Sequence, residues 1–122
     1  MPFDFDSARG RKEERALVDS GATANFIDQK TVKRLRLKTL KLEQTHSVRN
    51  IDGTFNQAGL ITRACDLLIS QGSKQERTRF YVTNLGGDRF IFGYPWLTAF
   101  TPSINWPQAI VNGPRFRVET LV

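Results

Sequence analysis

Short apolar segments separated by turn-forming residues are the feature that most constrains how this chain folds. The Asp52-Gly53 pair is a strong hairpin signal, and turns are also expected at 71–73 and 85–88. The segment 60–70 partly alternates apolar and polar residues, as strands with one buried face do. The sequence therefore predicts an all-β fold, a small barrel or sandwich, with one or two short helices.

The expected elements can be placed along the chain. We expect strands at 3–5, 14–18, 45–51, 60–70, 78–83, 90–92 and 115–122, and helices at 29–35 and 94–100. The first two strands flank a polar turn around Ala8-Arg9-Gly10 and predict a hairpin. Asp28 is a suitable N-cap for the first helix, and Pro95 suits the first turn of the second.

Length and composition exclude several classes of protein. A chain of 122 residues fits one domain covering 1–122, and 39% hydrophobic residues suffice for a packed core. No apolar stretch is long enough for a membrane span, and the N-terminus does not resemble a secretory signal. Cys65 is the single cysteine, which suits a reducing compartment, so we expect a cytoplasmic protein that is not secreted.

The remaining candidate chemistry is sparse. His46 is the only histidine, so neither a Ser-His-Asp triad nor a zinc-ligand cluster is expected, and no cofactor or metal is predicted. Cys65 is interpreted as a small buried residue of a strand rather than a nucleophile. Trp96 and Trp106 are interpreted as core anchors.

A net charge of +6 raises the question of nucleic-acid binding. Much of the excess lies in one run, formed by Lys30, Lys33, Arg34, Arg36, Lys38 and Lys41. Apolar residues interrupt this run, as in an amphipathic segment with a solvated face. No aromatic residue is interleaved with it, although stacking on single strands needs aromatics. A solvated face is the favoured interpretation and a polyanion-binding patch the alternative.

The segment from Ala16 to Thr23 has the most informative pattern. Three apolar residues lead to Asp19, and Ser20 and Gly21 follow at once. An ionised carboxylate next to a core strand is costly unless it has a partner. Gly21 is expected to allow a sharp turn, and Ser20 to hold that turn through its hydroxyl. The tripeptide alone fits an ordinary turn, but the apolar residues before it, Ala-Thr after it and a second apolar-apolar-glycine element, Ile91-Phe92-Gly93, make a plain turn less favoured.

These motifs resemble the retropepsin-like aspartic proteases, specifically the protease domain of gypsy-type LTR retrotransposon polyproteins. The resemblance rests on residues 16–28, 50–54 and 90–97 in that order, and extends from about Phe3 to Val111. At 101–106 the family often has Asn-Pro-x-Ile-Asp-Trp, whereas this chain has Thr-Pro-Ser-Ile-Asn-Trp. We expect that departure, at Asn105, to affect only a turn.

The resemblance implies a small closed barrel, one lobe per chain, and a role for each matching residue. Asp19 looks like the catalytic aspartate, with Ser20 and Gly21 as its signature loop. A flap is implied between about Val48 and Ile61. The residues implied in substrate binding or support of the site are Ala22, Ile51, Asp52, Gly53, Ile91 and Gly93.

Such chemistry needs two carboxyl groups that share one proton, because like charges ~3 Å apart do not both ionise. This chain has one Asp-Ser-Gly sequence, so a C2 homodimer with two copies of Asp19 on its axis is implied. The leading hypothesis is an aspartic endopeptidase that cleaves an extended peptide or its own polyprotein, in the cytoplasm or within a virus-like particle. The alternatives are an inactive or host-adopted dimeric peptide-binding module and a basic nucleic-acid-binding domain.

Overall fold

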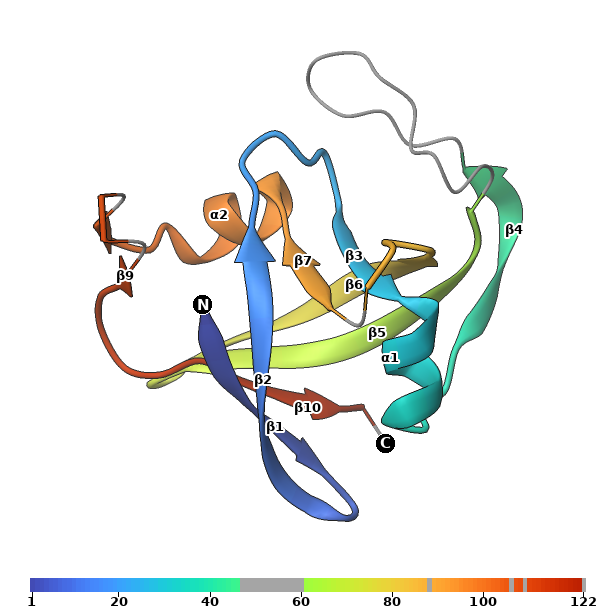
Figure 1. Cartoon of the computed structure of the whole chain (residues 1–122), viewed down its shortest axis with the longest axis horizontal. Helices are drawn as coiled ribbons and strands as arrows, with labels where there is room; N and C mark the ends of the chain where they lie inside the picture. Colours follow the sequence, from blue (N-terminus) through green and yellow to red (C-terminus); the bar gives the residue numbers. More distant parts are fainter. Residues whose placement is uncertain (47–60, 88, 106, 109, 122) are drawn as a thin grey trace.

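The computed structural model describes residues 1–46, 61–87, 89–105, 107–108 and 110–121 (Figure 1). Its elements are β1 (Pro2–Ser7), β2 (Gly10–Val18), β3 (Asn25–Asp28), α1 (Gln29–Arg34), β4 (Leu40–His46), β5 (Ile61–Gln71), β6 (Lys74–Thr83), β7 (Phe90–Phe92), α2 (Tyr94–Phe100), β8 (Ile104–Asn105), β9 (Ile110–Val111) and β10 (Arg117–Thr120). The predicted all-β fold with two short helices is confirmed.

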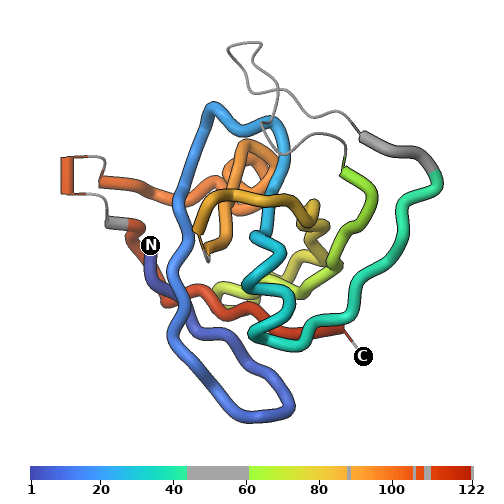
Figure 2. Tube along the Cα trace, turned by 45° about the vertical axis from the view of Figure 1, so that its right-hand side comes forward, coloured from blue at the N-terminus to red at the C-terminus, as the bar shows by residue number. Residues whose placement is uncertain are grey.

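Seven strands close into a barrel. They follow the order β10-β1-β2-β7-β3-β6-β5, and β10 also pairs with β5. Strand β5 is long enough to have a third neighbour: its first half pairs with β4 and its second half with β10. Near the chain ends, β1 runs parallel to β10, as the blue and red segments in Figure 2 show.

Aromatic side chains fill the barrel. Phe90 and Phe92 of β7 are fully buried and point into the main core, where Phe90 meets Phe3 edge-on with ring centroids 5.1 Å apart. Phe92 also packs against Trp96 of α2 at 5.2 Å, which fixes the helix against the barrel. Ile91, between them, belongs to a separate small cluster. Alternate side chains of β7 therefore pack into two different clusters. The predicted core role of Trp96 is confirmed.

Helix α1 begins where the sequence predicted. Asp28 is 1% exposed and caps the helix, its Oδ2 accepting a hydrogen bond from the Lys30 N–H at 2.8 Å. Its Oδ1 accepts from the Leu85 N–H at 2.7 Å, so the same carboxylate also fixes the loop after β6. One buried side chain thus joins the helix to a loop distant in sequence.

Several expected boundaries were wrong, and two kinds of element were missed. Strand β6 begins at Lys74 rather than Thr78, and β4 begins at Leu40 within the basic run rather than at Thr45. The short strand β3 and the β8–β9 pair had not been expected. The final strand is confirmed but covers only Arg117–Thr120. The predicted Asp52-Gly53 turn lies outside the described residues, as does Trp106.

The two ends of β2 lie at opposite ends of the barrel. In Figure 1 the loop from β2 to β3 lies near α2, while the turn between β1 and β2 lies at the other end. All six residues of the basic run are exposed, which both a solvated face and a polyanion-binding patch require. Within the described part of the chain, no helix has the length and apolar character needed to cross a membrane.

Candidate active site

The backbone of Asp19 is fixed by the end of a strand ladder. Strands β2 and β7 run parallel, with Val18 opposite Phe92. One residue further on, the Asp19 N–H donates to the Phe92 carbonyl at 3.1 Å. The sequence expectation that a core strand delivers this carboxylate is therefore correct in its geometry.

The loop that follows is a turn built on Asp19. Its Oδ1 accepts a hydrogen bond from the Gly21 N–H at 2.9 Å, and its carbonyl accepts from the Ala22 N–H at 3.1 Å. Its Oδ2 has no hydrogen-bond partner among the described residues. The expectation that Ser20 holds the turn was wrong: Ser20 is exposed, its hydroxyl makes no hydrogen bond within the described chain, and Asp19 supplies the bond instead.

Gly21 is needed for a different reason from the one the sequence suggested. Its φ does not lie in the left-handed region, so the turn does not require glycine for its conformation. A Cβ at this position would lie 3.1 Å from Oδ1 of Asp19. A side chain at position 21 would therefore crowd the carboxylate, whereas glycine leaves the Asp19 side chain in its observed orientation.

Gly93 is enclosed by the same loop. A Cβ on it would lie 2.2 Å from the Ala24 carbonyl oxygen and 2.9 Å from that of Ala22. The next residue, Tyr94, donates its N–H to the Ala22 carbonyl at 2.9 Å. The start of α2 and the Asp19 loop are thus in direct backbone contact, and only glycine fits at 93 without a backbone shift.

Asn25 is the residue of this region that the sequence analysis missed. It is 3% exposed, and its Oδ1 accepts the Gly93 N–H at 2.7 Å. A buried amide in a short strand that also contains Phe26 and Ile27 was the available signal, because such a group needs a partner. Asn25 is therefore a positioning residue that connects β3, the Asp19 loop and α2.

The other predicted site residues divide into two sets. Ala22 is 2% exposed and lies in a small cluster with Phe26 and Ile61, against which the half-buried Ile91 packs. The structure thus places Ala22, in the Asp19 loop, and Ile91 in the same small apolar cluster. Ile51, Asp52 and Gly53 lie outside the described residues, so their implied contact with substrate stays a prediction.

Two large side chains close to the loop are exposed. Leu17, two residues before Asp19 on β2, is 48% exposed, and Tyr94, which bonds to the loop backbone, is 55% exposed. Elsewhere most large apolar side chains of the described chain are buried. This end of the barrel therefore presents apolar surface beside a carboxylate.

The other nucleophile and ligand candidates can be placed as well. Cys65 is buried, as expected, and burial, with a smaller effect of Asp66, raises its thiol pKa to about 11. His46 lies at the end of β4. Asn105 exchanges hydrogen bonds with Gln108 in a local turn, as predicted for that departure from the family pattern. Among the described residues no group of three or more His, Cys, Asp or Glu side chains could hold a metal ion.

A family model describes most of this chain. Residues 15–116 match the PEG10/RTL1 protease domain, a retropepsin-like domain of proteins derived from gypsy-type retrotransposons. The match begins just before the Asp19 loop and includes β7 and α2, the elements that hold this loop in place. The chain therefore belongs to the PEG10/RTL1 protease-domain family, and its barrel is a retropepsin-like protease domain.

Proposed function

We propose that this domain is an aspartic endopeptidase that works as a homodimer, with Asp19 of each subunit supplying one carboxyl group. The observation that carries the proposal is the hydrogen bonding of the two Asp19 carboxylate oxygens. Gly21 orients one oxygen, while the other has no hydrogen-bond partner among the described residues. A general base that activates water needs such an oriented, available oxygen. Membership of a protease-domain family supports this assignment.

The need for a second subunit follows from the chemistry. One carboxylate takes a proton from water while the water oxygen attacks the peptide carbonyl, and the second carboxyl group protonates the developing oxyanion. The C–N bond then breaks and the amine leaves with a proton. Each chain has one Asp-Ser-Gly sequence, so the second carboxyl group comes from another copy.

The surface around Asp19 supports self-association at this end of the barrel. Leu17, two residues before Asp19, and Tyr94, which bonds to the loop backbone, are both exposed, and apolar side chains of this size are typical of buried interface centres. Ser20 is exposed at the tip of the turn, with a hydroxyl available for a partner. In the dimer these groups contact the second subunit or the bound peptide, which is an extended segment of a polyprotein.

The test compares two Asp→Asn variants in a peptide-cleavage assay. Asp19→Asn removes the base and is expected to lower kcat by at least about 1,000-fold with unchanged folding, the scale on which loss of a reacting group acts. Asp6→Asn is the matched control: Asp6 lies in β1, and its exposed ion pairs with Arg11 and Arg117 contribute little to stability. Cleavage that persists in purified Asp19→Asn would contradict the proposal.

Mixing the variants tests the shared site. An excess of inactive Asp19→Asn chains should suppress wild-type activity by forming mixed dimers with one functional aspartate, whereas Asp6→Asn chains should not. Specific activity should also rise with protein concentration as dimers form, which sedimentation can follow in parallel. A wild-type dimer that binds peptides without cleaving them would instead identify the peptide-binding module.

Nucleic-acid binding by the basic run is a second candidate function. Its six side chains are exposed, but Arg34 already donates two hydrogen bonds to Glu14, at 2.6 and 3.0 Å. The remaining charges form the face that would contact phosphates. Oligonucleotide affinity that falls steeply with salt would support this candidate, and affinity that is independent of salt would exclude it.

A further inference from the structure

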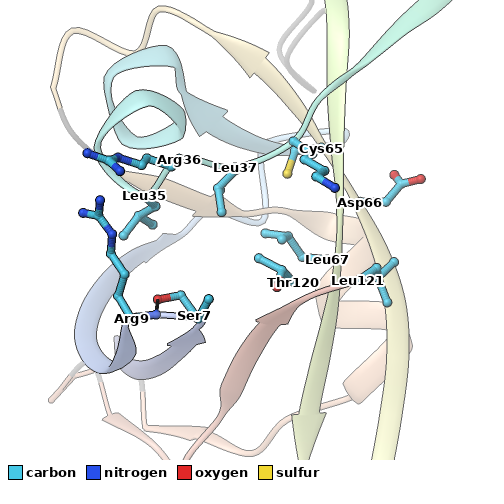
Figure 3. A pocket seen from close by; sticks show the side chains of 12 residues that line it. Ser7, Arg9, Leu35, Arg36, Leu37, Cys65, Asp66, Leu67, Thr120 and Leu121 are labelled. Atoms are coloured by element: carbon cyan, nitrogen blue, oxygen red, sulfur yellow. Dashed lines mark hydrogen bonds between the residues drawn. The ribbon is translucent and has the colours of Figure 1, made fainter.

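A pocket of about 320 Å³ opens beside the β1–β2 turn, at the end of the barrel opposite the Asp19 loop (Figure 3). It lies between the β1–β2 turn, the segment that follows α1, the middle of β5 and the end of β10. We call it the mouth pocket. Its floor is formed by Leu37, Cys65 and Leu67, and its rim carries Arg9, Arg36 and Lys38.

The floor of the mouth pocket is apolar. Leu37 is 9% exposed, Cys65 and Leu67 are each 1% exposed, and all three belong to the main core. Burial raises the pKa of the Cys65 thiol to about 11, so this group is neutral at physiological pH. A ligand that reaches the floor therefore meets carbon and a neutral thiol.

The rim, by contrast, carries three positively charged side chains. Arg9, Arg36 and Lys38 are exposed, and among the described residues none has an ion-pair partner. Figure 3 shows the guanidinium groups of Arg9 and Arg36 on the same side of the pocket. Like charges gathered at one opening repel each other, and an anion placed there relieves the repulsion.

Asp66, the one carboxylate among the described lining residues, does not supply this anion. Asp66 accepts two hydrogen bonds from Arg79, at 2.8 and 3.0 Å, and its Oδ2 lies 3.6 Å from Nη2 of Arg77. In Figure 3 its carboxylate lies across β5 from the floor side chains. The mouth pocket thus combines an apolar floor with a rim whose charge no described residue compensates.

We propose that the mouth pocket binds a small amphiphilic carboxylate, with the apolar body on the floor and the carboxylate at the rim between Arg9 and Arg36. The pocket volume corresponds to roughly ten water molecules at about 30 Å³ each, which leaves room for an acid with a chain of several carbons. Octanoate has this size and charge distribution. The mouth pocket is remote from Asp19, so the proposed binding does not depend on the proposed peptidase activity.

Octanoate is the probe, and amide NMR of the whole protein is the readout. Saturable shifts are expected at Leu37, Cys65 and Leu67, with a dissociation constant on the order of 0.1–1 mM for a ligand of this size. Octanoate should also slow the reaction of Cys65, the only cysteine, with an uncharged maleimide. Octylammonium has the same tail with the opposite charge and should bind at least about 10-fold more weakly.

A pair of double variants tests the rim. Arg9→Gln with Arg36→Asn removes both guanidinium groups, and asparagine suits the positive φ of 53° at position 36. This variant is expected to lose octanoate affinity by about 10-fold or more. Lys30→Gln with Lys33→Gln removes the same charge from the exposed face of α1, outside the pocket, and should bind normally.

Three outcomes would overturn the assignment. The first is the absence of saturable shifts at the floor residues up to several times the expected dissociation constant. The second is equal binding of octanoate and octylammonium, which would show that the rim charge has no role. The third is equal loss of affinity in both double variants, which would show a general charge effect rather than a site.

Discussion

The two ends of the barrel are stabilised in different ways. At the Asp19 end, backbone N–H groups bond to carbonyl and side-chain oxygens in a crowded loop, and the Gly93 N–H bonds to the buried Asn25. At the mouth-pocket end, exposed ion pairs predominate, such as Asp6 with Arg11, and several cations have no partner among the described residues. A site that must hold a carboxylate in one orientation benefits from the first kind of contact, because such contacts are short-ranged and insensitive to salt.

Glycine shows the same contrast. Gly10, the first residue of β2 after the β1–β2 turn, has a φ of +111° and open space around it, so it is needed for backbone conformation. Gly93 has an ordinary φ, but a Cβ there would overlap a backbone oxygen. The mouth-pocket end therefore requires glycine at position 10 for its backbone dihedral angle, and the Asp19 end requires glycine at position 93 because there is no room for a Cβ.

The largest expected effect is that of Gly93→Ala. The new Cβ would displace the Ala24 carbonyl and the start of α2, and the free energy of unfolding should fall by about 3 kcal/mol or more. Gly10→Ala, the matched control, introduces only backbone strain and should cost about 1–2 kcal/mol. Urea unfolding measures both, and equal losses would show that the crowding at Gly93 relaxes easily.

A smaller effect is expected from Asn25→Ala. It leaves the buried Gly93 N–H without its acceptor, which costs about 1–3 kcal/mol of unfolding free energy. Asn84 is the matched control, because its Oδ1 accepts the Gly86 N–H at 3.0 Å in an exposed turn where water can replace it. Asn84→Ala should cost less than about 0.5 kcal/mol.

Activity adds a second readout for this pair. Since Asn25 positions the loop that carries Asp19, Asn25→Ala should also lower kcat at temperatures where the variant remains folded, and Asn84→Ala should not. Full activity of folded Asn25→Ala would restrict Asn25 to a stabilising role.

These contacts also explain how far the sequence could predict the molecule. The strand before Asp19 and the glycine at 93 belong to local patterns, and both were placed correctly. Asn25 was missed because its partner lies 68 residues away: the local pattern shows an amide among apolar residues but not which group it bonds. Strand β3 was missed for a similar reason: it has four residues and is defined by parallel pairing with β6, far along the chain.

Strand β4 illustrates a different limit. Its first residues, Leu40 and Lys41, are both exposed, so the alternation that marks a half-buried strand is weak there. Pairing with β5, rather than burial, defines where this strand begins. The mouth pocket could not be predicted from local patterns either, because its floor combines residues of β5 with a segment that follows α1.

The smallest expected effect concerns the ion pairs of the mouth-pocket end. Hydrogen bonds from Arg11 and Arg117 lower the pKa of Asp6, and a hydrogen bond from Arg79 lowers that of Asp66. A carboxyl group with a lower pKa in the folded state stabilises that state above its unfolded pKa, and this contribution disappears as the pH falls through the folded pKa. The arginines are exposed, so the Asp6→Asn, Asp66→Asn double variant should lose only about 1 kcal/mol at pH 7.

This loss should shrink when the pH is lowered from 7 to an acidic value at which the two carboxyl groups of the wild type take up protons, and it should also shrink in high salt. The loss caused by Asn25→Ala should persist under both conditions, because it depends on a neutral, buried hydrogen bond. Urea unfolding at the two pH values and two salt concentrations tests both statements. If acid or salt weakened the two losses equally, the ends of the barrel would not differ in the way proposed, and the rigidity of the Asp19 loop would need another physical source.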